Sequence, residues 1–205
     1  MRCAVIERRT KETDIRLELG LDTQGQAPAH DAQGQVEVDT GIPFLNHMLS
    51  HVAMHGAFNL AVRARGDTEV DDHHTVEDIG ICLGQALREA LGDKRGIVRY
   101  AHQILPMDEA LVLMSLDISG RGLLVYEVSF AQPTVGLFHT ELIREFLQAL
   151  AANGGICLHV RLLTGSNTHH IAEAVFKALG RCLGEAVRID PCRADVVPST
   201  KGAIE

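Results

Sequence analysis

Two adjacent histidines followed by a glutamate occur twice in the chain, first in DDHHTVEDIG and later in NTHHIAEAVF. Each motif opens a segment with helical spacing of apolar residues, and side chains four residues apart lie on one face of a helix. His73 and Glu77 are therefore able to share one metal ion, as are His169 and Glu173. Neighbouring residues diverge by about 100° around a helix, so the second histidine of each pair points towards another ion. The doubled motif predicts two metal ions, each held by more than one element.

The two motifs lie at matching places in an internal repeat. HMLSHVAMHGAFNLAV (residues 47–62) overlays EFLQALAANGGICLHV (residues 145–160) without a gap, and each motif follows after a loop, two residues shorter in the second copy. A single His-His pair at a helix start is usually a solvated surface feature. Occurrence at repeat-related places favours metal binding instead. His47 and Glu145 also occupy matching positions, and both are competent ligands.

The predicted ligands are imidazole and carboxylate groups, without a thiolate. This donor set disfavours structural zinc and suits Mn²⁺, Fe²⁺ or Zn²⁺ in an open, reactive site, and the carboxylates favour Mn²⁺. His51 and His55 follow His47 at four-residue intervals on one helix face. They are candidates for lining the same pocket, and equally for buried, hydrogen-bonded histidines. His139, just ahead of a later helix, has no assigned role.

Hydrophobic periodicity predicts the elements that must position these residues. Alternating apolar residues predict strands at 3–10, 14–22, 35–40, 57–66, 100–106, 110–119, 122–130 and 156–163. Helical spacing predicts a helix after Thr40, a candidate cap, with Pro43 in its first turn, and further helices at 73–91, 140–152 and 169–187. Segment 23–34 is typical of a turn or hairpin loop, and the tail from Pro191 has no periodicity.

This order predicts an α+β fold of two pseudo-repeated halves, each a mixed four-stranded sheet backed by two helices. We expect a single domain, with repeats at about 1–95 and 96–190 and a C-terminal tail at 191–205. The net charge of −8 and pI near 5.7 argue against a general nucleic-acid-binding protein. No apolar run is long enough for a membrane span, and the first residues lack a signal-peptide pattern. Five cysteines at irregular spacing indicate reduced thiols and a cytoplasmic protein.

Several segments resemble the imidazoleglycerol-phosphate dehydratases of histidine biosynthesis over essentially the whole chain: RRTKET, GIPFLNHMLSH, DDHHTVEDIG, HHIAEAVFKA and PSTKGAI. The resemblance implies a hydro-lyase that converts imidazole glycerol phosphate, a small phosphate ester, to imidazole acetol phosphate, with two Mn²⁺ ions per active site and no organic cofactor. It also implies a homo-oligomeric shell of 24 subunits with metal sites shared between subunits. The residues that match the family's metal ligands are His47, His73, His74, Glu77, His169, His170 and Glu173. Glu145 stands where several family members carry histidine, and we keep it as a ligand; His139 stands where an acidic residue is expected.

The implied reaction is difficult because no carbonyl acidifies the departing proton and the hydroxyl is a poor leaving group. Two metal ions on the ring nitrogens would stabilise the substrate's imidazole as an imidazolate, which is able to expel the hydroxyl. Glu173 is the first candidate for the base, with Glu12 and Asp108 as the others.

Cationic and hydroxyl groups are expected to hold the phosphate. Arg99 and Arg121 match family positions with this role, and the tail becomes a phosphate-binding segment through PSTKG. The expected substrate-binding residues are Glu12, His47, His51, His55, Arg99, Arg121, Ser199, Thr200 and Lys201.

Two other classes of function compete with the dehydratase. A non-catalytic metal-binding shell would use the same ligands, but it leaves the phosphate-binding candidates without a purpose. A di-metal hydrolase is the other alternative, but its sites are usually rich in bridging carboxylates rather than imidazoles.

Overall fold

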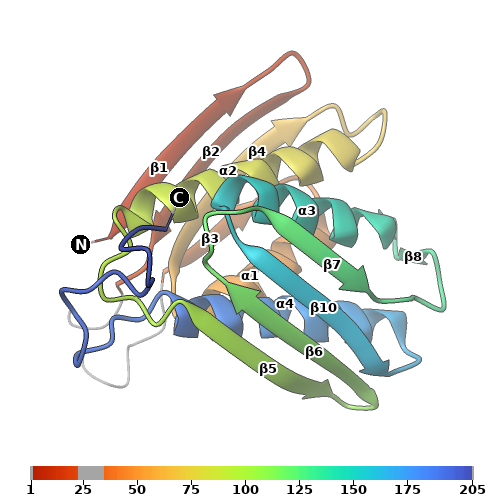
Figure 1. Ribbon diagram of the computed structural model, residues 1–205. Helices are drawn as coiled ribbons and strands as arrows, with labels where there is room; N and C mark the ends of the chain where they lie inside the picture. The colour runs from red at the N-terminus through yellow and green to blue at the C-terminus, as the bar shows by residue number, and fades with distance from the viewer. Residues whose placement is uncertain (1, 23–34, 205) are drawn as a thin grey trace.

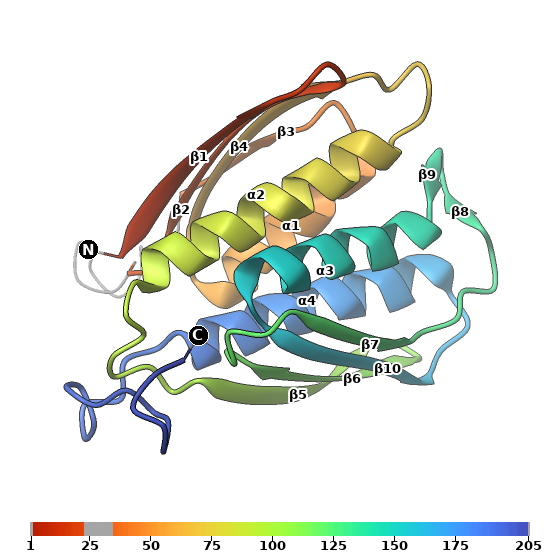
Figure 2. The same cartoon turned by 45° about the horizontal axis from the view of Figure 1, so that its top comes forward.

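The computed structural model describes residues 2–22 and 35–204, so the predicted turn or hairpin loop at 23–34 lies outside the described residues. Four helices lie between two four-stranded sheets (Figures 1 and 2). The elements of the first half are β1 (Cys3–Arg9), β2 (Thr13–Gly20), β3 (Val36–Asp39), α1 (Pro43–Gly56), β4 (Asn59–Gly66) and α2 (His73–Leu91). Those of the second half are β5 (Tyr100–Met107), β6 (Ala110–Asp117), β7 (Leu123–Glu127), β8 (Thr134–Val135), β9 (Phe138–His139), α3 (Glu141–Gly154), β10 (Cys157–Thr164) and α4 (Thr168–Ala186).

The two sheets have the same topology. Their strand orders are β1-β2-β4-β3 and β5-β6-β10-β7. In each, two antiparallel pairings are followed by one parallel pairing, β3 with β4 and β7 with β10. The predicted α+β fold of two pseudo-repeated halves with mixed four-stranded sheets is therefore confirmed. The short β8–β9 ladder, inserted before α3, was not predicted.

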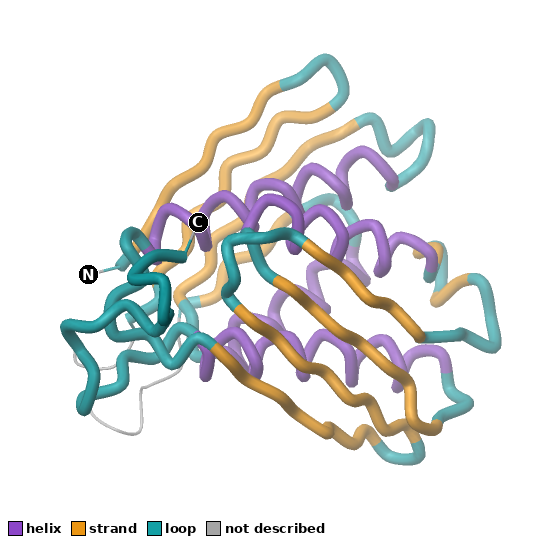
Figure 3. The backbone as a smooth tube through the Cα atoms, in the orientation of Figure 1, coloured by secondary structure: helices purple, strands orange, loops and turns teal. Residues whose placement is uncertain are grey.

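The helices form the middle of the molecule, where α1 and α2 cover the first sheet and α3 and α4 cover the second (Figure 3). Across the middle, α2 packs on α3 and α1 packs on α4. Glycines permit this close approach: a Cβ on Gly84 would lie 2.7 Å from the nitrogen of Gly154, and one on Gly180 would lie 2.6 Å from the oxygen of Val52. Because the ligand candidates lie on these helices, the helix contacts also set the distances within the site.

Three local details differ from the simple pattern. Strand β5 continues through Pro106, which an edge strand tolerates because the missing N–H faces no partner. Thr40 is not the cap of α1; Ile42 holds that position, while the Thr40 hydroxyl lies 2.6 Å from the Asn46 side-chain oxygen. Helix α4 begins at Thr168, where the Asn167 side chain accepts hydrogen bonds from the next two histidine backbone nitrogens.

The tail from Pro191 has no helix or strand in its described part. It lies beside the loop between α2 and β5, where the nitrogen of Gly96 donates to the oxygen of Val196 at 3.0 Å. None of the described helices combines the length and the apolar character that a bilayer-spanning helix needs.

Candidate active site

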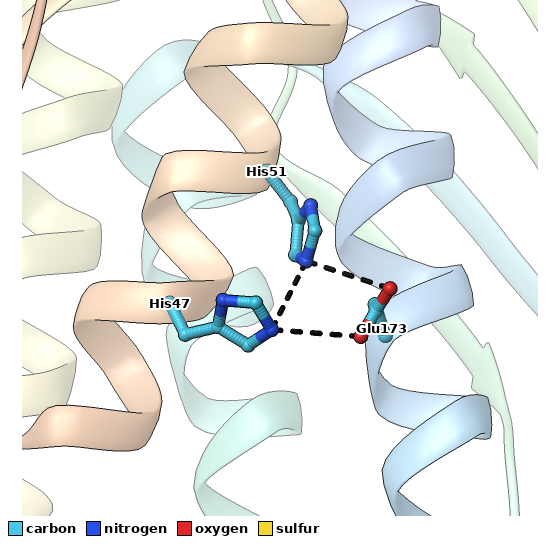
Figure 4. A group of neighbouring side chains, drawn as sticks. All are labelled: His47, His51 and Glu173. Atoms are coloured by element: carbon cyan, nitrogen blue, oxygen red, sulfur yellow. Dashed lines mark hydrogen bonds and ion pairs between the residues drawn. The ribbon is translucent and has the colours of Figure 1, made fainter.

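Three side chains meet where two neighbouring helices, α1 and α4, face each other (Figure 4). His47 and His51 lie one turn apart on α1, and their Nε2 atoms are 3.2 Å from each other. Glu173 on α4 faces both, with its oxygens 3.5 Å from each Nε2. One donor atom from each of the three residues lies within 4.8 Å of the others, a spacing suited to one metal ion. His51, expected only to line the pocket, thus belongs to the candidate ligands.

Glu173 is buried at the centre of this group, with 6% of its surface exposed. His169 Nε2 lies 3.1 Å from its Oε2, and Lys177 Nζ lies 2.5 Å from its Oε1. Burial would raise the pKa of Glu173, but the Lys177 hydrogen bond and the adjacent His51 outweigh it and hold the pKa at about 2. Glu173 is therefore an anion at neutral pH, as a metal ligand or a base must be.

Burial lowers the pKa of His51 to about 4, against the raising effect of Glu173. Burial also lowers the pKa of His55, whose ring stacks on that of His51 with centroids 5.7 Å apart. A neutral imidazole keeps a lone pair for coordination, so His51 is ready to bind a cation at pH 7 without first losing a proton.

The first doubled-histidine motif opens α2. His73 Nε2 lies 4.0 Å from Glu77 Oε2, as the four-residue spacing predicts. The ring of His74 stands at 86° to that of His73, so the two imidazoles do face different directions. His74 Nδ1 is 3.0 Å from Asp67 Oδ2, and Glu12 Oε2 approaches the same nitrogen at 3.9 Å. The Asp67 hydrogen bond raises the pKa of His74.

The second motif opens α4 in the same way, with the His169 and His170 rings at 89°. His170 Nδ1 is 2.7 Å from Glu109 Oε2, and Asp108 Oδ2 lies 3.7 Å from His170 Nε2. The hydrogen bond from His170 is the main reason that the pKa of Glu109 falls to about 2, helped by the backbone nitrogen of Asn167. The candidate acid–base residue Asp108 thus sits against a candidate ligand.

Of the two remaining residues, Glu145 lies away from these groups and the undecided His139 lies beside the start of α2. Glu145, the repeat counterpart of His47, pairs with Arg144 at 3.2 Å and lines a surface depression with Tyr126 and Phe130. His139 lies exposed on β9, close enough to Asp72 at the start of α2 to act on its pKa. Within the described part of one subunit, Glu145 is therefore not among the residues gathered around Glu173.

The expected phosphate-binding residues gather between the tail and the second sheet. Arg99 donates from Nε to Asp117 Oδ1 at 2.8 Å and from Nη1 to the carbonyl oxygen of Pro198 at 2.7 Å, next to the half-buried Ser199. The other two tail candidates are exposed: Thr200 and Lys201. Arg99 thus joins the tail to the body of the protein.

This group lies at the opposite end of the helices from the histidine motifs (Figures 1 and 2). The nitrogen of Arg99 donates to the oxygen of Ala186, the last residue of α4, and the nitrogen of Ile118, close to Arg121, donates to the oxygen of Arg99. His169 stands near the other end of α4, roughly 25 Å away at 1.5 Å per residue. That separation far exceeds a phosphate ester with one ring and a three-carbon chain.

Lys177, Asp67 and Glu109 contact candidate ligands but were not predicted from the sequence as site residues. Lys177 follows Glu173 by four residues, so the helical spacing used for the ligands would have found it. Glu109 adjoins Asp108 in the β5–β6 turn, but nothing in the spacing links it to α4. Asp67 follows β4 and reaches His74 only through the folded loop.

Comparison with known proteins identifies the family of this chain. The family model of imidazoleglycerol-phosphate dehydratase matches residues 40–183. The imidazoleglycerol-phosphate dehydratase of Desulforudis audaxviator is 56% identical over 204 residues, covering 100% of this chain and 98% of the relative; that of Dinoroseobacter shibae is 52% identical, with 100% of each covered. The crystal structure of the Staphylococcus aureus enzyme superposes with a TM-score of 0.80 at 38% identity, covering 92% of this chain and 99% of the other. The Pyrococcus furiosus enzyme gives 0.80 at 36% identity, covering 97% and 99%. The chain therefore belongs to the imidazoleglycerol-phosphate dehydratase family, the hydro-lyases of histidine biosynthesis.

Proposed function

We propose that the protein dehydrates imidazole glycerol phosphate to imidazole acetol phosphate with two divalent cations, best Mn²⁺, in each active site. The observation that carries the metal-dependent mechanism is the convergence of His47, His51 and Glu173, with one donor atom of each within 4.8 Å of the others. Lys177 Nζ lies 2.5 Å from one oxygen of Glu173, and the two imidazole nitrogens that face this carboxylate offer lone pairs to a cation.

The donor set fits Mn²⁺ because it combines imidazole nitrogens with carboxylate oxygens and has no thiolate. The residues that would hold the ions are His51 and the predicted ligands, His47, His73, His74, Glu77, Glu145, His169, His170 and Glu173. When bound, the cations supply Lewis acidity that lowers the pKa of the substrate's ring nitrogens.

The chain supplies proton carriers beside both motifs. Glu173 is ionised at neutral pH and is the first candidate to accept the proton from carbon. Glu12 and Asp108 stand 3.9 and 3.7 Å from His74 and His170, so a carboxylate flanks the second histidine of each motif. These positions suit groups that relay a proton to or from a substrate hydroxyl.

The phosphate would be held by Arg99, Arg121, Ser199, Thr200 and Lys201. Arg99 is already oriented by Asp117, and its contact with Pro198 places Ser199 close to the guanidinium. Charge-assisted hydrogen bonds of this kind orient a phosphate ester and fix the far end of the substrate.

We further propose that each active site forms between copies of the chain. In one subunit, the histidine motifs at the starts of α2 and α4 lie roughly 25 Å from the proposed phosphate-binding residues, by the rise of the helix. No single copy can contact both ends of the substrate, so metal ligands of one subunit would meet the phosphate-binding residues of another. The count of 24 subunits comes from the resemblance. The free thiols of all five cysteines support a cytoplasmic setting.

Turnover and metal content together test the proposal. The assembled protein loaded with Mn²⁺ should convert imidazole glycerol phosphate to an enolisable ketone, detected as its enolate in base. His47→Ala should bind less Mn²⁺ and lose turnover, whereas His159→Ala, on the exposed face of β10, should match the parent in both. Metal binding without turnover would leave a metal-binding shell, and phosphate release without ketone would indicate a hydrolase.

A further inference from the structure

The second histidine of each motif hydrogen-bonds through Nδ1 to a carboxylate from outside its own helix. His74 Nδ1 lies 3.0 and 3.3 Å from the two oxygens of Asp67, which follows β4. His170 Nδ1 lies 2.7 Å from Glu109, in the turn between β5 and β6. An imidazole that donates its Nδ1 proton to a carboxylate keeps its lone pair on Nε2 and becomes a better ligand.

The repeat does not relate these two carboxylates to each other. The central strand pairs have the same register, with the matched pairs Ile15–Ala64 and Val112–Leu162. Counting back along β2 and β6, the counterpart of Glu109 is Glu12. The pairing of β10 shifts by one residue between Leu162 and Thr164, so the counterpart of Asp67 is Ser166, which carries no carboxylate. The two halves therefore support their histidines from different strand ends.

The supporting carboxylates are themselves held in place. Glu109 Oε1 accepts the backbone nitrogens of Asn167 at 2.7 Å and Ser166 at 3.2 Å. Asp67 is largely covered, and its backbone nitrogen donates to the oxygen of Glu12 at 3.1 Å. The Glu12 carboxylate, by contrast, is mostly exposed and comes no nearer than 3.9 Å to His74.

We propose that Asp67 and Glu109 are positioning residues that fix His74 and His170 with Nε2 directed at the metal ions. Because Asp67 takes this role in the first half, Glu12 is released from it and remains available for proton transfer. The proposal rests on the metal-dependent function proposed above. It adds that the repeat-related residues Glu109 and Glu12 have different roles, Glu109 in orienting a metal ligand and Glu12 in proton transfer.

The positioning role can be tested without turnover. Calorimetry measures the Mn²⁺ affinity as the purified, metal-free protein is titrated with Mn²⁺ alone. Glu109→Ala should weaken Mn²⁺ binding by about 10- to 100-fold, as loss of such a partner typically does. Glu109→Gln keeps a carbonyl oxygen for the Nδ1 proton and should recover most of that affinity. Glu127→Ala removes an exposed carboxylate on β7 and should bind as the parent does.

Glu109 also accepts backbone nitrogens ahead of α4, so its alanine variant risks misfolding. Asp67→Ala provides a second test, because the contact to be lost there is the one with the His74 ring. It should weaken Mn²⁺ binding to a similar degree, and Asp67→Asn should restore it. Parental affinity in both alanine variants, or equal losses in the alanine and amide variants, would overturn the positioning role.

This difference in roles makes a separate prediction for Glu12. Glu12→Gln should keep the parental Mn²⁺ affinity while its kcat falls. If Glu12→Gln weakens Mn²⁺ binding as much as Asp67→Ala, the two carboxylates share one role and the proposal fails. If the parent itself binds no Mn²⁺, the proposed function fails instead, so the two failures are distinguishable.

Discussion

Replacing Gly180 by alanine should both destabilise the protein and loosen the proposed metal site, because α4 packs on α1 at this residue. The new Cβ would lie 2.6 Å from the carbonyl oxygen of Val52, which is 0.8 Å closer than the 3.4 Å at which ordinary contacts begin. Its neighbours are backbone atoms of Val52 and Gly56, so no side-chain rotation relieves the clash. The two helices must instead move apart.

The expected loss of stability combines two opposing effects. Overpacking costs about 1–3 kcal/mol, and alanine is about 1 kcal/mol better than glycine inside a helix. The difference is a net loss of up to about 2 kcal/mol, which corresponds to a drop in Tm of up to about 8 °C for a chain of this size. Glu173 lies two turns, about 10 Å, from Gly180 along α4 and faces His47 across the same helix contact, so Mn²⁺ binding should also weaken.

Gly154→Ala is the matched control. It lies at the equivalent contact between α2 and α3, but its Cβ would find its nearest neighbours at 3.6 Å. Thermal unfolding of the metal-free variants, followed by circular dichroism, should show a lowered Tm for Gly180→Ala and an unchanged or raised Tm for Gly154→Ala. A Gly180→Ala protein that melts at or above the parental temperature would refute this account of helix packing.

Four further substitutions test other parts of the molecule. The Arg2 hydrogen bond lowers the pKa of Asp22 below 3.8. The stabilisation of the folded state by this ion pair is therefore complete above pH 3.8 and is lost as the pH falls through the lower pKa of the folded state. Thermal melts from pH 5 to pH 2 should therefore be less pH-dependent for Asp22→Asn than for the parent, and equal slopes would contradict the ion pair's role. His73→Ala and His169→Ala should each contain less Mn²⁺ by elemental analysis; full content in both would rule out the shared helix-face ligands. Lys201→Ala should raise KM with unchanged Mn²⁺ content, and lost metal would remove Lys201 from the phosphate role.

Sequence periodicity predicted the fold because each element buries one regular face. Ile15, Leu17 and Leu19 alternate inwards along β2, and α2 begins and ends at the predicted residues. The gapless repeat between the halves predicted that the second sheet would repeat the first. The β8–β9 ladder escaped because two-residue strands have no period to detect.

Proximity of candidate site residues could be predicted where both lie on one helix, and it could not where the contact joins different elements. The spacing of His169 and Glu173 brought them within 3.1 Å of each other, as expected. Asp67 and Glu109 reach their histidines from strand ends, a relation that depends on how loops fold and leaves no spacing to read. Glu145 shows that matching positions in the repeat need not make the same contacts. The repeat matches it with His47, yet in this subunit it pairs with Arg144.

The proposed metal ligands and the proposed phosphate-binding residues lie at opposite ends of the helices, and this arrangement has a genetic consequence. A chain impaired at one end, such as His73→Ala, and a chain impaired at the other, such as Lys201→Ala, each retain what the other lacks. In the shared active sites proposed above, co-expression of the two chains in one particle would combine the intact ends of different chains at some centres. Two alleles that each fail alone should then complement in a histidine-requiring host, whereas two alleles damaged at the same end should not.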